Sequence, residues 1–229
     1  CHIGSQIFEE KSFLLAADKM ISYYCRLKDK MGIVFNSLNL GGGFGVWYAN
    51  GDREFTPDDY TNMLVLLLSR VKDKCSELNF PVPEVFIEPG RSLVCEAGIT
   101  VYKVGAVKNI PNLKKYLAID GGMFENPRFA LYQAKYTVKN PLKMFDNGTE
   151  IYTIAGKCCE SGDIIAEDVK LPEMKKGDYL CVFSTGAYNY SMASNYNRNL
   201  IPPVVFVKDG KSYYAVKKQT YEDLVRNDL

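Results

Sequence analysis

Apolar residues recur every three or four positions in two stretches of the first hundred residues, 13–31 and 60–78. This spacing places them on one face of a helix, so both stretches are predicted to be amphipathic helices. Just before the second stretch, Thr56 fits the N-cap, Pro57 fits the first helical position and Asp59 fits the partner position of a capping box. The second helix is therefore predicted to begin at Pro57.

Each predicted helix is followed by a short apolar run that ends in a loop, "GIVFNSLNLGGGFG" at 32–45 and "VPEVFIEPGR" at 82–91. Such runs are typical of buried strands. Strands that alternate with helices predict parallel βα units. Two or three units cannot close a barrel, which needs about eight, so we expect a partner or upstream sequence to complete the sheet.

The hydrophobic period changes after about residue 98. The segments that follow are short, rich in β-branched and aromatic residues, and separated by turn signals such as "NGT", "KKGD" and "KDGK". They are "GITVYKVGAV", "KYLAI", "EIYTIAG", "DYLCVFS", "PVVFV" and "KSYYAV". They predict an antiparallel β domain, a sandwich or a barrel. The predicted fold class is thus α/β plus all-β, with domains at 1–108 and 109–229.

Composition limits the possible partners and the compartment. The 229 residues carry a formal net charge of +1 and no block of like charges, so we expect neither nucleic acid nor a membrane as partner. The seven cysteines are odd in number and lack C-x-x-C spacing, which favours a reducing, cytoplasmic setting over a disulfide framework. His2 is the single histidine, so we expect no metal site at the adjacent Cys158 and Cys159.

Two motifs follow predicted strands. In "LGGGFG" (40–45), glycines could let the backbone approach a phosphate, and they would equally suit an ordinary tight turn. In "IEPGR" (87–91), Glu88 and Arg91 could line a site at the end of a parallel strand, or pair with each other to hold the loop.

Further candidates are single side chains with plainer alternatives. Arg128 and Tyr132 lie four apart in "DGGMFENPRFALY", where the arginine could grip a carboxylate or be buried against carbonyl groups. Tyr188 follows a flexible Gly-Ala and could equally be a packing residue. His2 and Ser5 in "HIGSQ" lie just before a helix, where they suit an aromatic ring and a phosphate, although a lone histidine is usually structural.

The order and wording of these motifs resemble one family. "HIGSQ", "GGGFG", "EPGR", "DGGM…PRFALY", "CCESGD" and "GAYNYSMASNYN" are similar, in that order, to the meso-diaminopimelate decarboxylases, fold-type III enzymes that use pyridoxal 5′-phosphate (PLP). "CESGD" is the most specific element. The resemblance implies an alanine-racemase-like (β/α)8 barrel that carries PLP, followed by the C-terminal β domain. It also implies a homodimer with shared active sites, in which the 157–163 loop serves the neighbouring subunit.

The resemblance implies roles residue by residue. His2 stacks on the pyridine ring, Glu88 faces the pyridine nitrogen, and Cys159 donates a proton after carbon dioxide leaves. The cofactor-binding residues implied are His2, Ser5, Gly43, Glu88, Pro89, Gly90, Arg91 and Tyr188. The substrate-binding residues implied are Arg91, Arg128, Tyr132, Glu160 and Tyr188, with Glu160 on the distal ammonium of diaminopimelate. Cys158 has no family role and is expected to pack.

One part of the family's machinery has no counterpart here. The family's cofactor lysine lies in an early barrel strand, and Lys135 in "YQAK" belongs instead to the later arginine–tyrosine motif. We therefore expect the C-terminal portion of a decarboxylase, inactive alone, that acts in the last step of lysine biosynthesis. The alternatives are a PLP decarboxylase of another diamino acid, of the ornithine, arginine or carboxynorspermidine type, and a non-catalytic regulatory homologue.

Overall fold

The chain forms two compact units in the computed structural model, which describes residues 1–229. The first unit comprises residues 1–47 and 51–96, and the second comprises residues 48–50 and 97–229. The sequence-based boundary at residue 108 differs, because it falls inside strand β3 (Thr100–Ile110). Since β3 pairs with β4 and β8, which belong to the second unit, the whole strand belongs there too.

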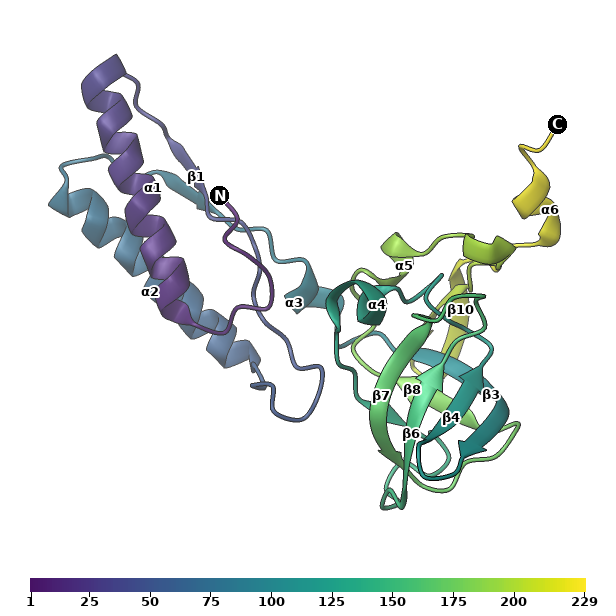
Figure 1. Cartoon of the computed structure of the whole chain (residues 1–229). Coiled ribbons are helices and arrows are strands. Elements are labelled where there is room, and N and C mark those ends of the chain that lie inside the picture. Colours follow the sequence, from purple (N-terminus) through teal and green to yellow (C-terminus); the bar gives the residue numbers. More distant parts are fainter. The chain divides into compact units, whose positions relative to one another are not determined.

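The first unit is built from two long helices and a pair of short strands. Both predicted helices are confirmed, as α1 (Glu10–Met31) and α2 (Pro57–Glu77), which lie side by side (Figure 1). The predicted cap is also confirmed, because Thr56 and Asp59 form a capping box at the start of α2. The apolar faces of the helices meet in a core with residues of the first strand. Its most buried members include Phe13, Ala17, Ile21, Leu38, Leu67, Val71 and Cys75.

The strands of the first unit are shorter than the apolar runs suggested. Strands β1 (Ser37–Asn39) and β2 (Glu84–Phe86) pair in parallel, as βα units predict, and helix α3 (Arg91–Val94) follows. However, Val34 lies outside β1 and is 50% exposed, and Phe86 is 45% exposed, so the prediction that these runs are buried is wrong at both positions. The strands have no second ladder partner here to cover them.

The second unit contains a six-stranded sheet in the order β5-β8-β3-β4-β6-β7. Besides β3, its strands are β4 (Lys114–Ile119), β5 (Val138–Lys139), β6 (Glu150–Ala155), β7 (Ile164–Leu171) and β8 (Tyr179–Val182). The pairs are antiparallel except β4 with β6, which are parallel, so the prediction of a purely antiparallel domain is wrong at this pair. The parallel pair is possible because a long connection carrying α4 (Arg128–Tyr132) and β5 joins the two strands. Sequence analysis missed β5 and β7.

The C-terminal part of the second unit is a hairpin flanked by short helices. Strands β9 (Val204–Lys208) and β10 (Lys211–Val216) pair around Asp209 and Gly210, both at positive φ, as the "KDGK" turn signal predicts. The remaining elements are helix α5 (Asn189–Met192), the 3-10 turn at Tyr196–Arg198 and helix α6 (Tyr221–Val225). The chain holds no helix long and apolar enough to cross a bilayer.

Candidate active site

In the first unit, the N-terminal segment runs against the glycine loop. The N–H of Ile7 donates to the Gly43 carbonyl at 2.9 Å, and the N–H of Gly45 donates to the Ile7 carbonyl at 3.0 Å. Gly43 has φ +98°, and a Cβ there would overlap the carbonyl oxygen of Gly4. The same Cβ would lie 3.5 Å from Cε1 of His2. The structure therefore places His2 beside Gly43, and a side chain at position 43 would clash with the backbone of Gly4.

Glu88 lies beside the same glycine loop. Its Oε1 accepts a hydrogen bond from Nδ2 of Asn39 at 2.7 Å, and its backbone N–H donates to the Gly41 carbonyl at 2.8 Å. A Cβ on Gly42 would overlap the Glu88 carbonyl oxygen, so backbone approaches backbone closely. Sequence analysis missed Asn39, whose signal was its place at the end of β1, two residues before the glycine run. These groups gather at the carboxyl ends of two adjacent parallel strands, where ligands bind in such sheets.

The remaining predicted residues of the first unit differ in exposure. Arg91 is the first residue of α3 and is 8% exposed, with Pro89 and Gly90 in the turn before it. Ser5 is exposed in the segment that pairs with the glycine loop. Arg91 is thus buried, whereas Ser5 is open to solvent.

In the second unit, three tyrosine rings surround Arg128. Its guanidinium carbon lies 5.4 Å from the ring centroid of Tyr132, 5.8 Å from Tyr188 and 5.9 Å from Tyr48, distances at which a cation attracts an aromatic face. Arg128 is buried and its Nε has no hydrogen-bond partner. The structure thus brings together Arg128, Tyr132 and Tyr188, three of the residues that the resemblance assigns to the substrate. Sequence analysis missed Tyr48, which lies far away in the sequence and joins the second unit through the fold.

The loop that carries the two cysteines is anchored by a buried carboxylate. Asp163 is 3% exposed and accepts the backbone N–H groups of Cys158 and Met123, each at 2.6 Å. Burial, together with the Asp163 carboxylate, raises the pKa of the Cys158 thiol to about 11. Cys159 and Glu160 are exposed on the same loop. The loop therefore keeps Cys158 half-buried and exposes Cys159 to solvent, next in sequence to the exposed carboxylate of Glu160.

A second buried carboxyl supports the loop that leads to Arg128. Oε1 of Glu125 accepts hydrogen bonds from the Tyr102 hydroxyl at 2.6 Å and from the Gly122 N–H at 3.2 Å. Burial raises the pKa of Glu125 to about 7. Burial of Tyr102, together with the neighbouring charge of Glu125, raises the pKa of the Tyr102 hydroxyl as well. Sequence analysis named the segments that contain both residues but singled out neither of them, because their pairing joins positions 23 residues apart.

Comparison with known proteins shows a family that matches most of this chain. The family of pyridoxal-dependent decarboxylases, in the part described as the C-terminal sheet domain, matches residues 14–186. The chain belongs to this family. The family match accounts for the sheet domain of the second unit and confirms the resemblance that the motifs suggested.

Among relatives of this chain, the diaminopimelate decarboxylase of Bacillus subtilis is 48% identical over 229 residues, which is 100% of this chain and 52% of the relative. That of Staphylococcus aureus is 46% identical over 229 residues, with the same coverage of 100% and 52%. The solved diaminopimelate decarboxylase of M. jannaschii has a TM-score of 0.87 and 34% identity, covering 100% of this chain and 51% of that one. The chain spans about half the length of the relatives it matches.

A more distant structure shares the fold of the decarboxylase chain. The lysine/ornithine decarboxylase of Vibrio vulnificus has a TM-score of 0.69 and 22% identity, and the match covers 86% of this chain and 50% of that one. At this identity the likeness shows the fold alone.

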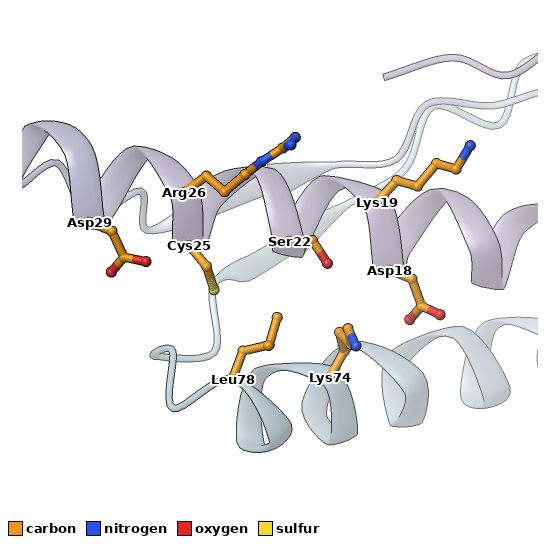
Figure 2. Close-up of a pocket in the computed structure, with 8 residues that line it drawn as sticks. All are labelled: Asp18, Lys19, Ser22, Cys25, Arg26, Asp29, Lys74 and Leu78. Atoms are coloured by element: carbon orange, nitrogen blue, oxygen red, sulfur yellow. The ribbon is translucent and has the colours of Figure 1, made fainter.

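Two further features of the chain are its free cysteines and a hollow in the first unit. All seven cysteines are free, and no group of three or more metal-ligating side chains gathers anywhere in residues 1–229. A hollow of about 600 Å³ lies between α1 and α2 (Figure 2). It is lined by Asp18, Lys19, Ser22, Cys25, Arg26, Asp29, Lys74 and Leu78. None of these is a predicted site residue, and Asp18 and Lys74 already pair with Arg70 and Glu77.

Proposed function

We propose that this chain supplies the C-terminal half of a meso-diaminopimelate decarboxylase, a carboxy-lyase that releases carbon dioxide from meso-2,6-diaminopimelate to give L-lysine. The similarity of the whole chain to diaminopimelate decarboxylases carries this proposal. The two half-sites support it, because one contains a glycine cradle with a carboxylate and the other contains an arginine, a thiol and a second carboxylate. The enzyme is proposed to work in the cytoplasm, where free thiols such as these persist.

The first half-site fits PLP as a cofactor. Gly43, at positive φ, lets the glycine loop pack closely against the Gly4 carbonyl, and the Ser5 hydroxyl and the Gly90 N–H are the donors proposed for the phosphate. His2, next to Gly43, can stack on the pyridine ring. When bound, PLP takes up the electrons released as carbon dioxide leaves. A carboxylate such as Glu88 favours a protonated pyridine nitrogen, and Asn39 fixes one of its oxygens.

The second half-site fits a substrate with a carboxylate and a distal ammonium group. Arg128 presents a buried Nε without a partner, which suits a charge-assisted bond to a carboxylate, with Arg91 of the first unit as another candidate. Glu160 offers an exposed carboxylate to the distal ammonium, and Tyr132 and Tyr188 line the arginine. The thiol Sγ of Cys159 can hand a proton to the carbon that has lost its carboxyl group.

The barrel and the dimer are parts of the same proposal. The β1–β2 pair is parallel and flanked by helices, as in a (β/α)8 barrel, and its exposed apolar residues suit further strands beside it. A homodimer would bring the exposed 157–163 loop to the site of a neighbour. Sedimentation of the assembled enzyme checks this: we expect a dimer whose formation is weakened by a bulky substitution at Ser161. A monomer with full activity would contradict the shared site.

The function is tested by carbon dioxide release from meso-diaminopimelate. The purified chain with added PLP should give no more than the rate of free PLP, because family members attach the cofactor to a lysine in the other half. Co-expression with the N-terminal half of the Bacillus subtilis relative should restore release. Activity of the chain alone would show that a lysine of this chain takes that part, and no release from the assembled protein would overturn the proposed function.

The alternatives differ in the substrate or in the absence of a reaction. An ornithine or arginine decarboxylase would act on a substrate without the second carboxylate, so release from ornithine or arginine by the assembled enzyme would favour it. A regulatory homologue would release no carbon dioxide from any of these amino acids, although this half carries each of the cofactor and substrate motifs expected in it.

A further inference from the structure

Besides Asp163, a short segment of the second unit, residues 196–199, contacts the cysteine loop. Within the segment Tyr196–Asn199, the Oδ1 of Asn197 accepts the backbone N–H of Cys159 at 2.7 Å. The hydroxyl of Tyr196 donates to Oε2 of Glu160 at 3.4 Å. Both residues that present chemistry on the loop are therefore contacted by side chains of the 196–199 segment.

The backbone of the 196–199 segment adopts an uncommon conformation. Asn197 has φ 53° and Arg198 has φ 56°, two successive non-glycine residues in the left-handed region. A side chain makes this backbone conformation unfavourable relative to the right-handed form, although asparagine tolerates it best. Strained backbone of this kind persists where the surroundings impose it, and it clusters at functional sites.

The surroundings hold the segment at both ends. Nδ2 of Asn195 donates to the Asn199 carbonyl and to Oε1 of Gln219, each at 2.7 Å. The guanidinium of Arg198 donates to the Leu224 carbonyl at 3.0 Å and to Asp228 at 3.1 Å. These hydrogen bonds hold the 196–199 segment in one conformation, so its contacts can position the cysteine loop.

We infer that Tyr196 and Asn197 are positioning residues for the Cys159–Glu160 loop, a role that rests on the proposed function. Asn197 fixes the backbone at Cys159 and so sets where the thiol points. Tyr196 holds one oxygen of Glu160 and fixes the plane of the carboxylate. The other oxygen, Oε1, has a single long contact, 3.5 Å from the Gly162 N–H, and stays available for an ammonium group.

The contacts of Asp163 explain why this role goes beyond folding of the loop. Asp163 already ties Cys158 to the loop at Met123 through two short hydrogen bonds. The 196–199 segment adds side-chain contacts at Cys159 and Glu160, and Nδ2 of Asn199 lies 3.6 Å from Sγ of Cys158, whereas the amide of Cys158 is held by Asp163. Its removal should leave the loop folded and change only how the thiol and the carboxylate are presented.

The first experiment measures amide hydrogen exchange in this chain, labelled with ¹⁵N-cysteine so that each cysteine gives its own NMR signal. Asn197→Gly keeps the positive φ and removes the acceptor, whereas Asn197→Asp keeps both. We expect exchange at Cys159 to become about tenfold faster in Asn197→Gly and to stay close to the wild-type rate in Asn197→Asp. The Cys158 amide, bonded to Asp163, is the internal reference and should not change. Equal exchange at Cys159 in all three proteins would overturn the role of Asn197.

The second experiment uses the assembled, active enzyme. Tyr196→Phe should raise KM for meso-diaminopimelate about three- to tenfold and leave kcat within about twofold. The variant loses the hydrogen bond that holds Glu160, and so weakens the contact that Glu160 is proposed to make with the ammonium of the bound substrate. Tyr190→Phe, on an exposed tyrosine of α5, is the matched control and should leave both constants unchanged. In Glu160→Gln, the added Tyr196→Phe should have a smaller effect, since the two residues act together.

The outcomes separate this inference from the proposed function. If the wild-type assembly is active and Tyr196→Phe matches Tyr190→Phe in KM, the role of Tyr196 is wrong and the function stands. If the wild-type assembly releases no carbon dioxide, the proposed function fails, and the amide exchange at Cys159 still decides whether the 196–199 segment holds the loop.

Discussion

The buried carboxylate of Asp163 accepts the backbone N–H of Cys158 at 2.6 Å, and this one contact distinguishes two adjacent cysteines. It holds Cys158 half-buried beside a negative charge, so the pKa of its thiol rises to about 11. Cys159, one residue later, is exposed and donates its N–H to Asn197 instead. Chemistry at the "CC" pair is therefore expected at the second cysteine.

The first prediction compares the two cysteines. In the assembled enzyme, Cys159→Ala should slow product formation about a hundredfold or more, as the loss of a general acid does. Cys158→Ala should be nearly silent, because Cys158 is half-buried with its backbone held by Asp163, whereas Cys159 is exposed. Single-turnover measurement of lysine formation checks both. The reverse ranking would show that the loop presents Cys158 instead.

The second prediction concerns Glu160. Glu160→Gln removes the negative charge that is proposed to face the distal ammonium and keeps the size of the side chain. The loss of a charge-assisted hydrogen bond, about 1.5–3 kcal/mol, should lower kcat/KM for meso-diaminopimelate roughly ten- to hundredfold. Glu167→Gln, on a carboxylate that pairs with Lys114 on the sheet surface, is the control and should leave kcat/KM unchanged. Unchanged turnover in Glu160→Gln would remove this residue from the site.

The third prediction tests the glycine loop of the first unit. Gly43 and Gly51 have nearly the same φ, +98° and +100°, yet a Cβ would overlap Gly4 at position 43 and would meet nothing within 4 Å at position 51. Gly51→Ala should lose about 1–2 kcal/mol from backbone strain alone. Gly43→Ala should lose roughly a further 1–3 kcal/mol from the overlap.

Urea unfolding followed by the fluorescence of Trp47, the single tryptophan and a member of the first unit, measures both losses. Equal destabilisation of the two variants would show that the segment before α1 does not lie against the glycine loop.

The fourth prediction follows from the raised pKa of Glu125. A carboxyl that titrates near 7 when folded and near 4.5 when unfolded binds its proton more tightly in the folded protein. It therefore contributes stability at low pH that is lost as the pH rises from about 4.5 to about 7, on the order of 3 kcal/mol. Glu125→Gln should abolish this decline, because the amide stays neutral at every pH.

Urea unfolding at pH 5 and pH 8, followed by circular dichroism of the β-sheet signal, compares the variant with the wild type. Other titrating groups affect both proteins alike, so the difference between them isolates Glu125. A decline of the same size in both proteins would place the folded pKa of Glu125 near its unfolded value.

Local patterns in the sequence determined the elements and most of the candidate residues. The helical spacing of 13–31 and the Thr56 capping box predicted α1 and α2, because amphipathic periodicity and capping depend only on residues a few positions apart. The "KDGK" turn predicted the β9–β10 hairpin for the same reason. The family resemblance rests on motifs that are contiguous in the chain, and the comparisons bear it out.

Only the tertiary structure decided which distant residues meet. The ring of Tyr48 over Arg128, the carboxylate of Asp163 between two loops and the contact of Asn197 with Cys159 join positions 38 to 80 residues apart. No local pattern specifies such pairs, because each depends on how strands register and connections cross. The parallel pairing of β4 with β6 has the same origin, since alternation fixes which face a residue takes and leaves the direction of its neighbour open.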